Sequence, residues 1–330
     1  MVPRSGSRPA LGLVGRREFL ALLAPLAGCG SRPRVEAASG SLSVSAPPPV
    51  NTRLVFGGDV MLSRYVSRNA HQRNDPSWPF RRIAPVFEAA DIAFVNLESP
   101  FTERKLPFDK GMIFGASPDM LEGLRLAGID VVSTANNHAR DCGDKGVEFT
   151  LQLLEDNGIT AAGTGLTEDL AHEGALIERN GIRFGFLAYT YDQRNGNHQD
   201  DDDRIAVMDI DRLREDLSSL KQRADVSIVS MHAGVEYQTR QNSRQTAFAR
   251  AAVDCGAAVV VGHHPHVVQP VEKYNGGVIF YSLGNLIFDQ SEPAGTERGL
   301  VAEVTFNGNR LLSYAVKPLI IRNTVPELSS

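Results

Sequence analysis

The stretch Ala257-Ala-Val-Val-Val-Gly-His-His-Pro-His266 joins a continuous apolar run to a cluster of histidines. A run of small and β-branched residues is typical of a strand buried on both faces, as in the middle of an α/β sheet. Side chains that follow such a strand converge at the carboxyl edge of the sheet, where α/β proteins bind ligands. His264 and His266 are spaced so that both imidazoles can face one ion, and histidine is the commonest metal ligand. The stretch therefore predicts an α/β fold with a metal site at the end of this strand.

Other short apolar strands also run directly into polar residues that can bind a metal or transfer a proton. These strands end at Asp59, at Asn96-Leu97-Glu98, at Asn136-Asn137-His138, at His232 and at Asn285. Helices are expected between the strands, at 117–127, 146–157, 211–223 and 245–255. This alternation predicts a layered α/β fold whose strand ends share one catalytic edge. Only the C-terminal part, with strands at 299–306 and 310–317 around an Asn-Gly turn, predicts an antiparallel hairpin.

The first 28 residues have the organisation of an export signal. Arg16-Arg17-Glu18-Phe19-Leu20 resembles a twin-arginine signal, and the apolar run from Phe19 to Gly28 is too short to span a bilayer. Leu26-Ala27-Gly28-Cys29 resembles a bacterial lipobox, in which Cys29 is lipidated and becomes the new N-terminus. The alternatives are an ordinary Sec signal and a tail with accidental arginines. We therefore expect an exported protein that is lipid-anchored at the bacterial cell envelope through Cys29.

Residues 29–50 are rich in Ser, Ala and Pro and have no helical period, which predicts a flexible tether before a domain at 51–325. The net charge is −5 and the body of the chain has no basic cluster, which argues against nucleic acid as a partner. The sequence leaves open whether Cys142 and Cys255 form a disulfide after export or remain buried thiols.

Taken in order along the chain, the motifs resemble those of one known family. They are Gly58-Asp59, Asn96-Leu97-Glu98, Asn136-Asn137-His138, His232, His264-Pro265-His266 and Ser282-Leu283-Gly284-Asn285. The set is similar to the CapA family, the poly-γ-glutamate capsule synthesis proteins of the calcineurin-like metallophosphoesterase superfamily. The resemblance covers about residues 52–322. It implies a four-layer α/β/β/α sandwich of the metallo-dependent phosphatase type, with a dinuclear metal centre at the strand ends.

The resemblance also implies the metal ligands, which are Asp59, Glu98, Asn137, His232, His264 and His266. In this scheme Asp59 and His266 bind the first metal, Glu98 bridges, and the remaining three bind the second. Two cations about 3.5–4 Å apart polarise a phosphoryl or carbonyl oxygen and activate water. Because the ligands are nitrogen and oxygen atoms without thiolates, the set favours two divalent ions of Mn, Fe or catalytic Zn over a structural zinc site.

The remaining site residues are expected to act on the substrate. By the resemblance, His138 is a general acid that binds no metal, and Asp141 orients its imidazole. Arg64, Asn136 and Asn285 are expected to contact substrate. The alternatives are a helix cap for Asp141, a surface ion pair for Arg64 and a turn residue for Asn285.

Two positions depart from the superfamily pattern. Its first motif is Asp-x-His, but this chain has Asp59-Val60-Met61, as is usual in the CapA branch. Methionine is a poor ligand for hard or borderline cations, so the first metal loses a ligand unless another group compensates. Ala233 stands where many relatives have tryptophan. His263, directly before the ligand pair, is expected only to line the rim of the site.

Two functions of different classes follow. The first is a cell-envelope protein of capsule or poly-γ-glutamate biosynthesis or processing, whose metal centre hydrolyses a phosphoester or an amide-linked polymer. The second is a non-catalytic accessory subunit that binds or guides an anionic polymer through its metals. Either one is expected to work near a membrane polymer-synthesis complex.

Overall fold

The computed structural model describes residues 50–104, 112–194 and 200–329. The predicted signal peptide, Cys29 and nearly all of the predicted tether lie outside these ranges. β1 (Asn51–Val60) begins where the domain was predicted to begin, whereas β14 (Val325–Leu328) runs past the predicted end at 325. Cys142 and Cys255 are free thiols, and the first of them is buried.

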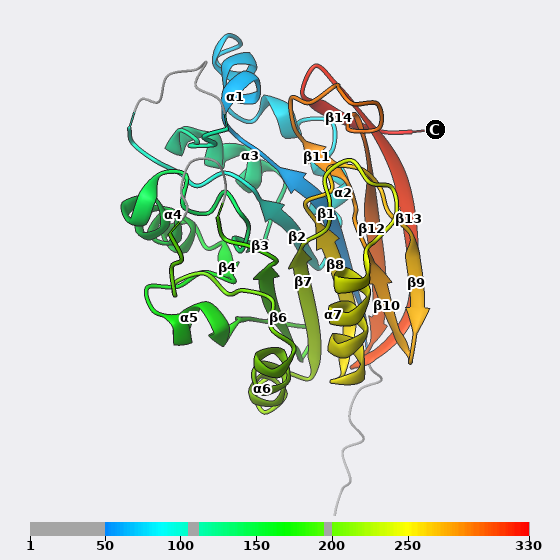
Figure 1. The fold of residues 1–330 in the computed structure, drawn as a ribbon. Coiled ribbons are helices and arrows are strands. Elements are labelled where there is room, and N and C mark those ends of the chain that lie inside the picture. Colours follow the sequence, from blue (N-terminus) through cyan, green and yellow to red (C-terminus); the bar gives the residue numbers. More distant parts are fainter. Residues whose placement is uncertain (1–49, 105–111, 195–199, 330) are drawn as a thin grey trace, which may run out of the picture. The chain divides into compact units, whose positions relative to one another are not determined.

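The strands form two sheets (Figure 1). The larger sheet contains β1, β2 (Ile92–Leu97), β3 (Val131–Ser133), β4 (Thr160–Ala162), β11 (Asn285–Ile287), β12 (Arg298–Asn307), β13 (Arg310–Arg322) and β14. Its order is β14-β13-β12-β1-β2-β3-β4, and β11 also pairs with β1. The smaller sheet contains β5 (Ala175–Arg179), β6 (Ile182–Thr190), β7 (Val226–His232), β8 (Ala257–His263), β9 (Val271–Tyr274) and β10 (Gly277–Phe280). Its order is β5-β6-β7-β8-β10-β9.

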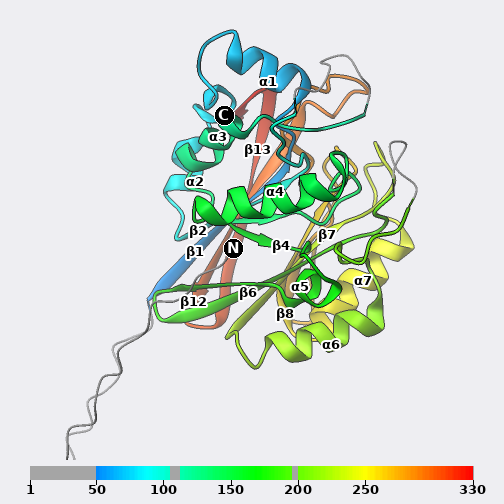
Figure 2. The ribbon, with the colours of Figure 1, turned by 90° about the vertical axis from the view of Figure 1, so that its left-hand side faces the viewer.

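Helices lie on the outer face of each sheet (Figure 2). The larger sheet carries α1 (Arg64–His71), α2 (Ala84–Glu88), α3 (Leu121–Leu126) and α4 (Gly143–Asp156), with 3-10 turns η1 (Trp78–Phe80) and η2 (Pro118–Met120). The smaller sheet carries α5 (Glu168–Glu173), α6 (Ile210–Leu220) and α7 (Ser243–Asp254). Local sequence explains where α7 begins, because Asn242 and Gln245 form a reciprocal capping box.

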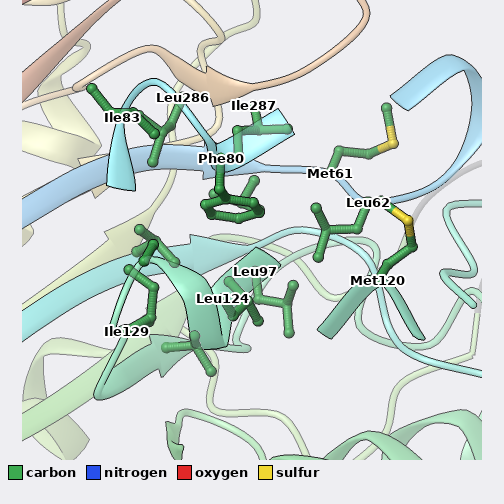
Figure 3. Close-up of a cluster of buried hydrophobic side chains, with 14 of the residues drawn as sticks. Met61, Leu62, Phe80, Ile83, Leu97, Met120, Leu124, Ile129, Leu286 and Ile287 are labelled. Carbon is green, nitrogen blue, oxygen red and sulfur yellow. The ribbon is translucent and has the colours of Figure 1, made fainter. Parts of the chain in front are cut away.

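Three separate apolar cores hold these layers together, one between each pair of neighbouring layers. The first packs the larger sheet against its helices, with Phe80 and Leu124 among its members (Figure 3). The second lies between the two sheets, where Phe94 of β2 stacks on Phe186 of β6 with ring centroids 5.8 Å apart. The third packs the smaller sheet against α6 and α7. The four-layer α/β/β/α sandwich predicted from the sequence is therefore confirmed.

Parallel pairing brings the carboxyl ends of the central strands to one edge. β1, β2 and β3 run parallel in the larger sheet, and β6, β7, β8 and β10 do so in the smaller one. The predicted C-terminal hairpin is confirmed as β12 and β13, although β13 continues to Arg322 and pairs with β14. No helix in the described ranges is both long enough and apolar enough to cross a membrane.

A close backbone approach places β11 beside the end of β1. A Cβ atom on Gly58 would lie 1.9 Å from the carbonyl oxygen of Gly284, so only glycine fits at this position. The amide of Asp59 donates a hydrogen bond of 3.0 Å to the same carbonyl. Asp59 and Asn285 are consequently paired across the two strands.

Candidate metal centre

The first ligand group consists of Asp59 at the end of β1, Glu98 just after β2, and His266 just after β8. One ligand atom from each lies within 4.8 Å of the others, and all three side chains are buried. Nε2 of His266 is 3.6 Å from Oε1 of Glu98, and its Nδ1 is 3.5 Å from Oδ2 of Asp59. Two carboxylates and an imidazole at these separations form a candidate site for a divalent cation.

The second group contains His232, Asn137 and His264. Nε2 of His232 lies 2.9 Å from Oδ1 of Asn137, and the rings of His232 and His264 are 4.9 Å apart. Burial lowers the pKa of His232 well below its usual value, and burial together with nearby His266 lowers the pKa of His264 to about 3. Both imidazoles are therefore neutral near neutral pH, which is the form that binds metals.

Asn96 connects the two groups and was not among the residues predicted for the site. Its Nδ2 lies 2.9 Å from Oδ1 of Asp59, 3.5 Å from Oε2 of Glu98 and 3.3 Å from Nδ1 of His232. The sequence contained a signal for it, because residues two apart on a strand share a face and Glu98 follows Asn96 at that spacing. Asn96 fixes the orientation of ligands from both sheets.

The two buried carboxylates differ in their electrostatics. Burial raises the pKa of Asp59, but His263 and His266 outweigh it and hold this pKa well below the usual range. Burial raises the pKa of Glu98 well above its usual value. Burial lowers the pKa of His266, yet Glu98 and Asp59 overcome this and raise it to about 9. A divalent cation would replace the proton of His266 as the charge that balances the two carboxylates.

Unpartnered buried atoms provide a test of whether these residues fit a metal. Oε1 of Glu98, Nδ1 of His264 and both ring nitrogens of His263 are buried and make no hydrogen bond within the described residues. Each such atom costs about 1–3 kcal/mol if it stays without a partner, and native proteins keep few of them. Since nitrogen and oxygen ligands of this kind suit divalent cations, the residues present fit metal ions at this edge.

Beside the ligands, His138 and Asp141 form a preorganised pair. Nδ1 of His138 lies 2.8 Å from Oδ2 of Asp141, which also accepts a 2.7 Å hydrogen bond from the amide of Phe114. The Phe114 ring stacks on the imidazole with centroids 3.8 Å apart. The structure thus brings together the two residues predicted for acid–base catalysis and fixes the imidazole on two sides.

Two of the predicted substrate contacts engage other parts of the protein. Asn136 is fully buried; its Oδ1 accepts from the amide of His138 at 3.1 Å, and its Nδ2 donates to the carbonyl of Leu97 at 2.9 Å. These bonds position the loop that carries His138. Arg64 forms an ion pair with Asp289, which is largely buried and is therefore not the surface ion pair of the alternative interpretation. Its guanidinium lies 4.9 Å from the Phe114 ring centroid.

The third predicted substrate contact, Asn285, positions the candidate metal ligand His266. Its Oδ1 lies 2.9 Å from Nδ1 of His266, which directs Nε2 of that imidazole towards Glu98. Its Nδ2 donates to Gln290 at 3.3 Å, and Gln290 in turn donates to the hydroxyl of Tyr237 at 3.4 Å. Asn285 begins strand β11 and is not a left-handed turn residue. A chain of hydrogen bonds thus joins the half-exposed Tyr237 to His266.

The turn that carries the ligands has a strained backbone. His264 and His266 have φ values of +95° and +57°, and Tyr237, whose amide bonds the carbonyl of Pro265, has a φ of +66°. Positive φ is uncommon for residues other than glycine and costs of order 1–3 kcal/mol at each position. Such strain is typical of functional sites, where surrounding contacts hold side chains in place.

The departure at Met61 is explained by where its side chain lies. Met61 is fully buried in the apolar core between the larger sheet and its helices, with Leu62 and Met120 nearby (Figure 3). Its sulfur accepts from the amide and hydroxyl of Ser63 at 3.2 and 3.1 Å. The expectation that His263 lines the rim was wrong, because this residue is fully buried beneath the site.

A cavity of about 1090 Å³ opens next to the second ligand group. Tyr191 lines it and lies with its ring 4.8 Å from that of His264, so the cavity and the candidate centre share a wall. Among the described residues that line it, six carry carboxylates, including Asp202, and four are arginines, including Arg204 and Arg244. Arg204 is paired with Asp202, whereas Arg244 lies exposed at the start of α7. The lining of the cavity that is described therefore has more acidic than basic side chains.

Known proteins resemble this chain over most of its length. The family model described as "Bacterial capsule synthesis protein PGA_cap" matches residues 53–290. The chain is 33% identical over 275 residues to the PGA biosynthesis protein CapA of Bacillus subtilis (strain 168), covering 82% of this chain and 72% of that protein. It is 32% identical over 280 residues to the capsule biosynthesis protein CapA of Bacillus anthracis, covering 82% and 67%.

Among solved structures, the chain is similar to one described as a novel phosphatase from Mycoplasma pneumoniae. The TM-score is 0.53 at 16% sequence identity, and the match covers 82% of this chain and 94% of the other. At this identity the similarity shows the fold alone, which agrees with the layered sandwich.

Proposed function

Because the chain belongs to the bacterial capsule synthesis protein PGA_cap family, we propose that it acts in capsule or poly-γ-glutamate synthesis as a metal-dependent hydrolase. The substrate is an anionic polymer, or a phosphoester or amide linkage in it or its precursors. The relatives from two Bacillus species are named for capsule and PGA biosynthesis, which supports the pathway. The hydrolytic part of the proposal rests on the site itself.

The observation that carries the proposal is the His138–Asp141 pair beside the ligand groups. A buried imidazole held at 2.8 Å by a carboxylate is the arrangement that general acid–base catalysis needs. A site that served only to bind metal would have no use for this oriented pair. His138 directly follows the candidate ligand Asn137 in the chain, so its imidazole is expected at the same edge of the sandwich as the candidate ligands.

The chain's own residues would act as follows. Divalent ions, when bound by the two ligand groups, supply Lewis-acid activation of a substrate oxygen and of water. Asp141 holds the proton of His138 on Nδ1, so exchange of a proton with the leaving group is assigned to Nε2. Asn285 and Asn96 hold the candidate ligands in place.

The proposal also includes the location of the protein. The twin-arginine and lipobox patterns support export and lipid anchoring at Cys29, on the outer side of a membrane. Such an anchor would hold the domain beside a membrane complex that makes the polymer. A Cys29→Ser variant should be released into the soluble fraction, and continued partition with membranes would contradict the lipid anchor.

A second candidate is the non-catalytic accessory subunit that binds or guides an anionic polymer. The specific observation that favours it is Met61, whose side chain lies in the apolar core and leaves the first metal with fewer ligands than the superfamily pattern. A weaker first site is compatible with polymer binding without turnover.

The test combines metal analysis with an activity screen of the purified protein. Metals per chain are measured by mass spectrometry, and hydrolysis is assayed on aryl phosphate monoesters and diesters and on poly-γ-glutamate. The hydrolase proposal expects stoichiometric metal, turnover of at least one substrate class, and loss of that turnover in His138→Ala. Metal binding and polymer binding without turnover would favour the accessory subunit. Absence of stoichiometric metal would contradict both.

A further inference from the structure

His263, the last residue of β8, faces the space between the two sheets. It pairs in register with His232 on β7, and paired residues on neighbouring strands point to the same face. The side chain of His232 is one of the candidate ligands. The His263 ring therefore lies on the ligand side of the smaller sheet, fully buried, although the sequence did not suggest a role for it.

The surroundings of His263 offer it only one polar neighbour at close range among the contacts that the structure describes. Its Nδ1 lies 3.2 Å from Oδ1 of Asp59, and its ring lies 6.2 Å from the Phe94 ring in the inter-sheet core. Neither ring nitrogen makes a well-directed hydrogen bond within the described ranges. Leaving a buried nitrogen without a partner costs about 1–3 kcal/mol, so something else must satisfy this imidazole.

The distance to Asp59 is the one that two ligands of a single ion adopt. Two ligand atoms each about 2.0–2.2 Å from one cation are about 2.8–3.6 Å apart at octahedral or tetrahedral angles. The observed separation of 3.2 Å between Nδ1 and Oδ1 falls within that range. Asp59 is already a member of the first ligand group, together with Glu98 and His266.

The first ligand group also lacks the nitrogen that the superfamily's Asp-x-His motif supplies. In this chain Met61 stands at that position, and its side chain lies in the apolar core on the other face of the larger sheet. A ligand that replaces it must therefore come from elsewhere in the fold. His263 reaches Asp59 from the smaller sheet.

We propose that His263 is a further ligand of the metal bound at Asp59 and supplies the nitrogen that Met61 does not. The proposal rests on the proposed metal centre and adds a residue to it. Coordination satisfies a buried imidazole nitrogen that is otherwise without a partner. It also explains how the first site can hold an ion although its motif is incomplete.

The test measures metal binding directly and does not depend on activity. The full chain and its His263→Ala variant are stripped of metal and titrated with Mn²⁺ and Co²⁺ alone. We expect the unmodified chain to bind two ions of either metal. In the variant, the affinity for one of these two bound ions should fall by more than about tenfold. The visible absorption of the Co²⁺ form should also change, because a bound nitrogen has been lost. His71→Ala is the control, since His71 is an exposed histidine paired with Asp119.

A second variant distinguishes the loss of a metal ligand from a folding defect. His263→Gln keeps a side chain that reaches Asp59 and donates a hydrogen bond, but its amide is a poor metal ligand. Near-ultraviolet circular dichroism and metal-free unfolding temperatures identify which variant is folded. The glutamine variant should show the same loss of affinity and the same change of the Co²⁺ spectrum.

Two results would overturn the proposal. Unchanged affinity in both folded variants would show that His263 binds no metal. Reduced affinity with an unchanged Co²⁺ spectrum would show that His263 acts only by holding Asp59. Failure of the unmodified chain to bind metal would instead contradict the proposed function, so the two failures are distinguishable.

Discussion

The side-chain oxygen of Asn285 lies 2.9 Å from Nδ1 of His266, although Asn285 begins β11 of the larger sheet and His266 follows β8 of the smaller one. This bond fixes which nitrogen of the imidazole faces Glu98. Asn285 was predicted to bind substrate, but its side chain instead positions the candidate ligand His266. Several consequences of this arrangement can be measured.

Asn285→Ala should weaken metal binding at the first site by about 10- to 100-fold, because the outer partner of a ligating histidine holds its tautomer and orientation. Titration with Mn²⁺ in competition with a chelator measures the change. Gln152→Ala removes an exposed amide that bonds Asp156 on α4 and serves as the control. An Asn285→Ala variant with the affinity of the unmodified protein would show that Asn285 does not position His266.

Asp141→Asn should reduce kcat by roughly 100- to 10,000-fold on any substrate that the protein hydrolyses, because an amide cannot hold the His138 proton on Nδ1 as a carboxylate does. Metal content should not change, since neither residue belongs to a ligand group. Asp119→Asn alters the exposed His71–Asp119 pair and provides a matched control with full activity. Equal kcat values for Asp141→Asn and the unmodified protein would remove His138 from the acid–base role.

The stabilising effect of metal should increase with pH. Burial lowers the pKa of His266, but Glu98 and Asp59 raise it to about 9, above the usual value near 6.5. The interaction of protonated His266 with the carboxylates therefore stabilises the metal-free fold fully below about pH 6.5. This stabilisation is lost as the pH rises through about 9, because His266 gives up its proton. The proton of His266 then no longer competes with a metal ion.

Unfolding temperatures measured with and without Mn²⁺ check this prediction. The rise in unfolding temperature that Mn²⁺ causes should become larger from about pH 6.5 to about pH 9. A His266→Gln variant, which has no group that titrates at this position, should lose most of the increase. A difference that stays constant over the same range in the unmodified protein would contradict the prediction.

Met61→Leu should be tolerated, because the Met61 side chain packs in an apolar core and the exchange conserves volume. We expect a change of less than about 1.5 kcal/mol in the free energy of unfolding and no change in bound metal. Met61→Ala should cost about 2–5 kcal/mol through the cavity that it leaves, again without loss of metal. Chemical denaturation and metal analysis measure both, and loss of an ion in Met61→Leu would assign the sulfur to the site.

Much of the fold could be predicted from local sequence. The apolar runs ahead of Asp59, His232 and His263 form buried strands, and the charged amphipathic segment at 211–223 forms α6 at 210–220. These elements follow from periodicity and capping, which are local properties. The length of β13 was underestimated because its continuation to Arg322 depends on pairing with β14, which is a tertiary interaction.

The site could be predicted less completely. A residue's position after a strand predicts that it lies at the site, but the direction of its side chain depends on packing. Asn136 and Asn285 lie at the site, but their side-chain amides form hydrogen bonds with other residues of the protein. Asn96 also lies there, and its spacing of two from Glu98 was the only local signal for it. His263 lies there too, and no local signal distinguished it from a residue at the rim. Their roles became apparent only from distances between the two sheets.

The stack of Phe94 on Phe186 has a consequence for the spacing of the candidate site. Asp59, Glu98 and Asn137 come from the larger sheet, and His232, His264 and His266 from the smaller one. The thickness of the aromatic layer between the sheets, where these rings are 5.8 Å apart, therefore sets the span across which an ion must be held. Side chains that never touch the candidate site, such as Phe94 and Phe186, therefore set how far apart the candidate ligands of the two sheets lie.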